Sequence, residues 1–168
     1  MKIHTYEKLW LAASMVLIVL FIASVTFGSV GAGVSMINAD EDTINPDEIG
    51  THEDFGDPGV VQVDDNEYEV YVQAFHPNFN PSTIEVPANS TVTFKVTSGD
   101  VIHSFSIVGT NANTMVIPGE IASLTVETED PGSYGIVCNE YCGEFHHEME
   151  GELRVVPEDE FELEEDDE

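Results

Sequence analysis

Residues 90–98 read Ser-Thr-Val-Thr-Phe-Lys-Val-Thr-Ser, and apolar and polar side chains alternate through this stretch. Val92, Phe94 and Val96 fall on one face, while threonine and lysine fall on the other. Alternation with a period of two predicts a half-buried β-strand. Segments on both sides of this stretch also have the composition of strands, so the stretch indicates an all-β fold class.

Short segments rich in β-branched and aromatic residues surround it. We expect strands at 68–75, 83–86, 103–108, 114–117, 121–127, 134–138 and 151–156. Asn-Pro, Gly-Asp and Pro-Gly pairs separate several of them and are typical of turns. About eight short strands at this spacing predict an all-β sandwich or barrel, and residues 66–156 are enough for one core.

The N-terminal region is hydrophobic. No charged residue lies between Lys8 and Asp40, and residues 9–27 read LWLAASMVLIVLFIASVTF. A bilayer core needs about 20 helical residues, so residues 1–35 are expected to contain one transmembrane anchor at about 9–30. A cleaved signal peptide is the alternative, but its apolar region is usually shorter.

Charge predicts the orientation of this anchor. Lys2 and Lys8 precede it, whereas ten acidic residues lie within 36–65. The positive-inside rule places the N-terminus in the cytoplasm. We therefore expect a single-pass protein of the cell membrane, in contact with lipid, with its C-terminal domain on the extracellular or periplasmic side.

The chain of 168 residues has 33 Asp and Glu against 4 Lys and Arg, a net charge of −29. This balance excludes a nucleic-acid partner, since phosphate binding requires clustered basic residues. We interpret 36–65 as an acidic linker and 157–168, with nine acids in twelve residues, as a disordered tail. The excess acidity of every soluble segment favours a halophile, in which salt screens self-repulsion. Folding should then need high ionic strength, and equal stability in dilute buffer would contradict this.

One short stretch carries metal-ligating side chains. Residues 138–149 read CNEYCGEFHHEM, which gives the pattern C-x3-C-x3-H-x2-M through Cys138, Cys142, His146 and Met149. His103 begins an earlier predicted strand. Thiolate, imidazole and thioether ligands together select copper. A mononuclear blue-copper site uses one Cys, so the second Cys suggests two bridged copper ions, with one backbone carbonyl completing the set.

Other interpretations of these residues remain open. In an exported domain the two cysteines could form a disulfide, and a Cys pair with His could hold zinc. His103 and Met149 taken singly are more often packing residues. His147 stands beside His146 but fits the spacing less well, and His52 and His76 are interpreted as surface histidines.

With these motifs the sequence resembles subunit 2 of the haem-copper cytochrome oxidases. The pattern of Cys138, Cys142, His146 and Met149 is similar to that family's binuclear CuA site. The segments Tyr6–Trp10, Ile84–Pro87, Asp100–His103 and Val108–Asn111 resemble its short, single-helix form, found with B-type oxidases. The resemblance implies a cupredoxin-like Greek-key β-sandwich over 66–156.

The resemblance also implies ligands and a role. One copper ion would take His103 and Met149, the other His146 and the backbone carbonyl of Glu140, with Cys138 and Cys142 bridging both. The chain would be the electron-entry subunit of a membrane-bound terminal oxidase. It would accept electrons from an external donor, a cytochrome c or a small blue-copper protein, and pass them to haem in oxidase subunit 1, where oxygen is reduced to water.

One departure from the family's pattern limits what the resemblance implies. Larger family members have an exposed Trp for electron entry, whereas Trp10 lies in the anchor. Phe75, Phe79 and Tyr141 are therefore candidates for that role, with a buried core position the equal alternative for the two phenylalanines. The alternative function is a stand-alone, membrane-anchored protein that binds copper or transfers electrons outside any oxidase.

Overall fold

A computed structural model describes residues 4–30 and 43–163, and the chain divides into two units at Val34. The first unit contains the helix α1 (Thr5–Val30). Its segment Thr5–Gly28 is long and apolar enough to cross a membrane. Apolar side chains surround the helix on all sides, as expected of a helix that faces lipid. The prediction of an apolar N-terminal helix is confirmed.

The second unit is a β domain. Its described residues form ten strands and two short 3₁₀ turns. In chain order these are η1 (Pro46–Thr51), β1 (Val60–Asp64), β2 (Glu67–Phe75), β3 (Asn78–Asn80), β4 (Thr83–Pro87), β5 (Ser90–Ser98), β6 (His103–Ile107), β7 (Asn113–Val116), β8 (Ala122–Thr128), β9 (Gly132–Val137), η2 (His146–Glu148) and β10 (Glu150–Val156).

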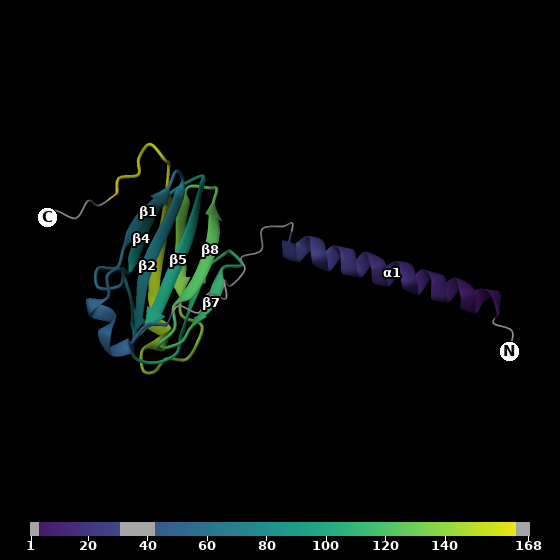
Figure 1. The fold of residues 1–168 in the computed structure, drawn as a ribbon, viewed down its shortest axis with the longest axis horizontal. Coiled ribbons are helices and arrows are strands. Elements are labelled where there is room, and N and C mark those ends of the chain that lie inside the picture. The colour runs from purple at the N-terminus through teal and green to yellow at the C-terminus, as the bar shows by residue number, and fades with distance from the viewer. Residues whose placement is uncertain (1–3, 31–42, 164–168) are drawn as a thin grey trace. The chain divides into compact units, whose positions relative to one another are not determined.

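The strands form two sheets that pack face to face (Figure 1). One sheet has the order β1-β2-β5-β8, with β3 paired to β2, and the other has the order β4-β10-β9-β6-β7. β2 pairs with β5 in parallel, and β10 pairs with β4 in parallel. Each parallel pair requires a connection that crosses to the other end of the domain. The predicted all-β sandwich is confirmed.

The core lies between the sheets because every second side chain of each strand points inward. Val92, Phe94 and Val96 of β5 are fully buried, as their alternation predicts. Phe105 packs against Phe94 and Phe79, with ring centroids 5.2 and 5.7 Å apart. Phe79 is therefore a core residue and not an exposed site for electron entry.

The start of the domain is folded where the sequence suggests a linker. Residues 31–42 lie outside the described residues, but Thr43 pairs with Glu120, and Ile44, Ile49 and Phe55 are buried together. Within the acidic linker expected at 36–65, residues 43–59 are therefore part of the folded domain. Three widely spaced apolar side chains give no periodic signal, yet each finds a buried position against the domain.

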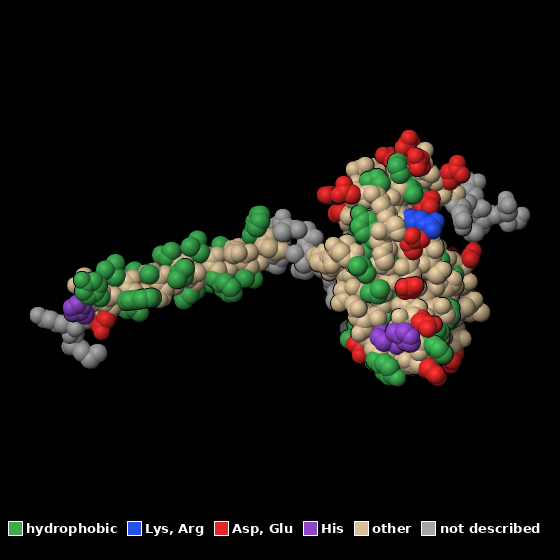
Figure 2. Space-filling view, turned by 180° about the vertical axis from the view of Figure 1, so that it is seen from behind, with side chains coloured by type: hydrophobic (Ala, Val, Ile, Leu, Met, Phe, Trp, Pro, Cys, Tyr) green, Lys and Arg blue, Asp and Glu red, His purple; other side chains and the backbone are tan. Residues whose placement is uncertain are grey.

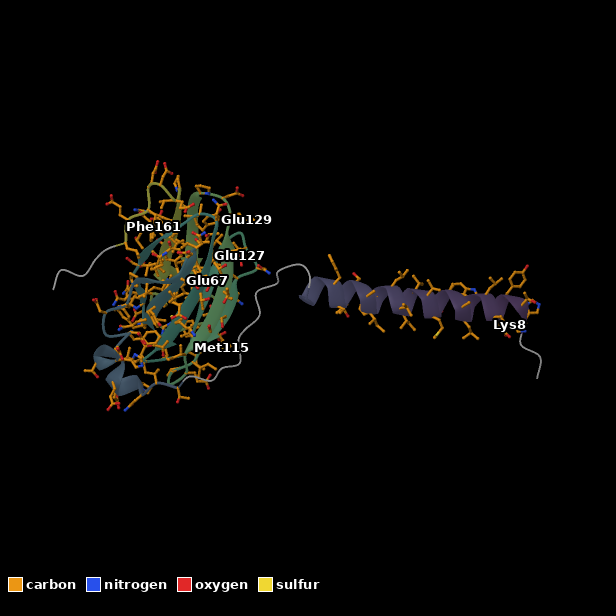
Figure 3. The ribbon with its side chains drawn as sticks, turned by 45° about the horizontal axis from the view of Figure 1, so that its top comes forward. Lys8, Glu67, Met115, Glu127, Glu129 and Phe161 are labelled. Carbon is orange, nitrogen blue, oxygen red and sulfur yellow. The ribbon has the colours of Figure 1, made fainter. Side chains whose placement is uncertain are left out.

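Part of the acidic C-terminal segment also contacts the domain. The Phe161 ring packs edge-on against Tyr68, with centroids 5.5 Å apart. Figure 3 labels Phe161 toward the end of the domain where Glu129 lies, with Met115 toward the opposite end. Residues 164–168 lie outside the described residues.

Candidate metal centre

The sequence-predicted ligands come from two connections at one end of the sandwich. His103 is the first residue of β6, and its ring is fully buried. Cys138, Cys142, His146 and Met149 lie in the connection from β9 to β10, which we call the copper loop (residues 138–149). β6 and β9 are neighbours in one sheet, and their pairing brings His103 beside this loop. Figure 2 shows histidine side chains gathered at one end of the β domain.

Cys138 is the centre of one half of the ligand set. Its Sγ lies 3.9 Å from His103 Nδ1 and 3.2 Å from the carbonyl oxygen of Glu140. The main-chain N–H of Ser104 donates to the same sulfur at 3.5 Å. Such an N–H stabilises negative charge on a thiolate, so the strand that carries His103 also supports Cys138.

Cys142 is the centre of the other half. Its Sγ lies 3.4 Å from His146 Nδ1 and 3.6 Å from Met149 Sδ. The ligand atoms of His103, Cys138 and Cys142 all lie within 4.8 Å of one another. Both cysteines are free and buried, so the disulfide that the sequence left open is not formed.

The separations and chemistry of these atoms fit copper. Two ligand atoms about 2.0–2.3 Å from one tetrahedral metal ion lie roughly 3.3–3.8 Å apart, close to the distances around each sulfur. Two thiols, two imidazoles and a thioether form a soft set that suits copper. Burial and the neighbouring Cys138 thiol raise the pKa of Cys142. A bound cation offsets that effect, because thiols lose their protons when they bind metal.

The backbone of the copper loop is unusual where it turns between ligands. Gly143 has φ +135°, and Phe145 has φ +64°. The first is a conformation that glycine adopts readily and other residues rarely do. The second is a left-handed conformation that costs a bulky residue energy. Together they turn the chain so that His146 faces back toward Cys142.

Asp100 holds the His103 ring from behind. Its Oδ1 lies 2.8 Å from His103 Nε2. A carboxylate there accepts a hydrogen bond from Nε2–H, which leaves Nδ1 unprotonated and facing Cys138, as is common for metal-binding histidines. Partial burial alone would raise the pKa of Asp100, but hydrogen bonds from four partners lower it to about 2: the His76 main chain, the His103 ring, the Val101 main chain and the Ser98 hydroxyl.

The remaining histidines fall into different environments. The His147 side chain is 77% exposed and lies 3.5 Å from a Glu148 carboxylate oxygen. His52 packs against the ring of Phe55. His76, interpreted from the sequence as a surface residue, is half-buried and contacts the Glu144 carbonyl oxygen in the copper loop.

Sequence reasoning therefore missed two residues next to the ligands. Asp100 had a signal, since it stands three residues before His103 in a segment already noted for its resemblance. His76 had none, because it lies 68 residues from its partner Glu144. Only the pairing of distant strands reveals such a neighbour.

Comparisons with known proteins agree with this geometry. Residues 78–156 match the family described as cytochrome C oxidase subunit II, periplasmic domain. A cytochrome c oxidase subunit 2 of Thermus thermophilus is 39% identical over 91% of this chain and 93% of the relative. A second from Thermus thermophilus is 42% identical over 67% of this chain and 84% of the relative.

A solved structure agrees over a similar extent. A chain of a haem-copper terminal oxidase dimer, determined by cryo-EM, superposes with a TM-score of 0.67 at 29% identity. The match covers 90% of this chain and 99% of that chain. The cupredoxin-like fold implied by the resemblance is thereby confirmed. The apolar helix and the family make the chain a membrane-anchored subunit with an extracellular domain, and it belongs to the cytochrome c oxidase subunit 2 family.

Proposed function

We propose that the chain is the electron-entry subunit of a membrane-bound haem-copper oxidase and that it holds two copper ions in the loops at one end of its β domain. The observation that carries this proposal is the pair of free, buried thiols with separate histidines, His103 Nδ1 3.9 Å from Cys138 and His146 Nδ1 3.4 Å from Cys142. The two imidazoles lie beside different thiols, so each of two thiolate-bridged metal ions can take an imidazole of its own.

The residues divide between the two ions as follows. His103 and Met149 would bind one, His146 and the Glu140 carbonyl would bind the other, and both cysteines would bridge. The Glu140 carbonyl lies 3.2 Å from Cys138 Sγ, and Met149 Sδ lies 3.6 Å from Cys142 Sγ, so both stand beside a bridging sulfur as ligands would. Which ion each of them binds is taken from the family resemblance. When bound, the pair would supply a one-electron redox centre.

The protein contributes shielding and rigidity to this centre. Met149 is 2% exposed and His103 is fully buried, and both cysteines are buried, so water has little access to these four ligands. The copper loop is fixed at both ends by β9 and β10, which pair across Val137 and Glu150. A site held this way changes little between oxidation states, which favours electron transfer.

An external donor would dock at the same end of the domain. Exposed apolar side chains flank the ligands there: Val101 and Ile102 precede His103, while Tyr141 and Phe145 lie in the copper loop. The Tyr141 side chain is 77% exposed, and its ring centroid is 5.8 Å from that of His146. Tyr141 is therefore the best-placed side chain for electron entry from a cytochrome c or a small blue-copper protein.

The charge of the domain bears on that encounter. Figure 2 shows acidic side chains spread over one face, with few basic ones. If the protein works in concentrated salt, charges are screened and steering is weak. We expect the electron-transfer rate from the donor to depend little on salt above about 1 M, a concentration at which the Debye length is about 3 Å. A steep salt dependence would contradict this.

The proposal also includes the orientation of the chain in the membrane and its electron acceptor, oxidase subunit 1. The N-terminus would lie in the cytoplasm and the copper loop outside, with electrons passing to haem in oxidase subunit 1. Purification of the tagged chain from its own membranes should recover a haem-bearing subunit. Recovery of the chain alone, with copper but without haem, would favour the stand-alone copper protein instead.

The test of the metal centre is copper loading of the full chain in detergent and high salt. The expected result is two copper ions per chain, a purple colour and an electron paramagnetic resonance spectrum of one electron shared over both ions. One copper ion per chain with a blue colour would overturn the binuclear assignment. Zinc bound in preference to copper would overturn the redox role.

A further inference from the structure

His76 lies outside the two segments that carry the ligands. It follows β2 in the opposite sheet, whereas His103 and the copper loop belong to the β6, β9 and β10 side. Its side chain is half-buried. Its ring Nε2 contacts the carbonyl oxygen of Glu144, which lies between Cys142 and His146. A carbonyl oxygen only accepts, so Nε2 carries the proton and donates.

The same ring also packs against the backbone of the copper loop. An added Cβ on Gly143 would lie 3.1 Å from His76 Cδ2 and 3.1 Å from Nε2. Gly143 directly follows Cys142. The ring therefore occupies the space beside the turn that directs the chain from Cys142 to His146.

The main chain of His76 reaches the other ligand segment. Its N–H donates to Asp100 Oδ2 at 2.7 Å, and Asp100 Oδ1 lies 2.8 Å from His103 Nε2. One residue is thus linked to both halves of the ligand set, through its backbone to His103 and through its ring to the segment between Cys142 and His146.

We propose that His76 is a positioning residue for the metal centre, which fixes the copper loop relative to His103 by a hydrogen bond from its ring to the Glu144 carbonyl. This inference rests on the proposed function, because it assigns a role relative to the proposed ligands. Outer partners of this kind typically contribute about 10- to 100-fold to metal affinity. They also set the ligand geometry on which the spectrum depends.

The test compares three variants of the copper-loaded full chain in detergent. His76→Ala removes the ring and its donor. His76→Phe keeps a ring beside Gly143 but removes the donor. His76→Gln keeps a donor at about the position of Nε2. His147→Gln is the matched control, since His147 lies in the copper loop with its exposed ring directed to Glu148.

Copper release to a chelator and the electron paramagnetic resonance spectrum are measured for each variant. We expect release about tenfold faster from His76→Ala and His76→Phe, with altered copper hyperfine splitting. His76→Gln should restore most of both, and His147→Gln should match the unaltered chain. Wild-type release and spectrum in His76→Phe would overturn the proposal, as would His76→Gln behaving like His76→Phe.

Two further readouts separate this proposal from others. Copper content of the unaltered chain reports on the proposed function itself: without two copper ions there, the function fails whatever the His76 variants do. Circular dichroism and thermal unfolding of the metal-free chains report on folding. If His76→Ala does not fold, the comparison of His76→Phe with His76→Gln, which both fill the space, still decides the question.

Discussion

The two ends of the β domain use the same two sheets but bury different polar groups. At the end away from the copper loop, the hydroxyls of Ser90 and Thr128 both donate to the Pro87 carbonyl, at 2.6 and 2.7 Å. At the metal end, the buried groups include two thiols and the His103 imidazole, and the half-buried His146 ring lies beside Cys142. The first end satisfies its polar atoms with the main chain and closes the sandwich. The second leaves its sulfur and nitrogen atoms available to a metal.

The largest effect should come from Cys142→Ser at the metal end. A serine hydroxyl does not replace a thiolate as a bridge between two soft ions. Copper content should fall from two ions per chain to at most one, with loss of the shared-electron spectrum. Metal analysis and electron paramagnetic resonance check this. Ser133→Ala, near the start of β9 and away from the loop, is the control and should retain both ions.

The two ends can next be compared at glycines with positive φ. Gly143 has φ +135° and faces His76, whereas Gly109 has φ +85° and has no atom within 4 Å of an added Cβ. Gly143→Ala should lower the free energy of unfolding by about 2–3 kcal/mol and speed copper release, since strain and a close contact add. Gly109→Ala should cost only about 1–2 kcal/mol and leave copper release unchanged.

Chemical denaturation of the metal-free chains gives both free energies, and a chelator competition gives the release rates. Equal effects of the two substitutions on copper release would show that the turn at Gly143 has no special relation to the metal centre. The two substitutions would then differ only in the backbone strain that each introduces.

A smaller effect is expected from Thr128→Val at the closed end. The buried Thr128 hydroxyl donates to the Pro87 carbonyl at 2.7 Å and lies 3.0 Å from the Ser90 hydroxyl. Its loss should lower the free energy of unfolding by about 1–2 kcal/mol, while the copper spectrum stays the same. A changed spectrum would show that the two ends are coupled through the sheets. Thr110→Val, at a more exposed hydroxyl, is a milder control.

The smallest effect should be that of Phe145→Gly. Phe145 has φ +64° and its side chain is 49% exposed. Relief of the left-handed conformation, about 1–2 kcal/mol, is partly offset by the conformational freedom of glycine, about 0.5–1 kcal/mol. The metal-free chain should gain less than about 1 kcal/mol by thermal or chemical unfolding. A clear loss of stability would instead mean that contacts of the Phe145 ring contribute more to stability than the left-handed backbone costs.

Much of the fold was predictable because half-buried strands show alternating apolar and polar residues in the sequence. The expected strand at 90–98 coincides with β5, and the expected strands from 68 to 156 each correspond to an observed one within a few residues. β1 was missed, since four of its five residues are exposed and it lies in an acidic region without a clear pattern. The folding of 43–59 was missed for a similar reason: Ile44, Ile49 and Phe55 are too far apart to show a period.

The ligand types were also predictable, because four of them fall within twelve residues and a fifth begins a strand. The arrangement of these ligands around the metal centre could not be predicted from the sequence. Whether Cys138 and Cys142 form a disulfide, which histidine faces which sulfur, and where Asp100 points are matters of geometry. The structure places His146 at 3.4 Å from Cys142 and leaves His147 exposed, a difference that neighbouring positions in a sequence only suggest.

By itself, the sequence determined the apolar anchor, the alternating strands, the acidic balance and the set of soft ligands, because each depends on residue type and local spacing. The tertiary structure decided which strands pair in parallel, how the two ligand segments meet, and that His76 from the opposite sheet contacts the copper loop. Those relations join residues far apart in the chain. Contacts of that kind arise only when the two sheets pack and the strand register is set.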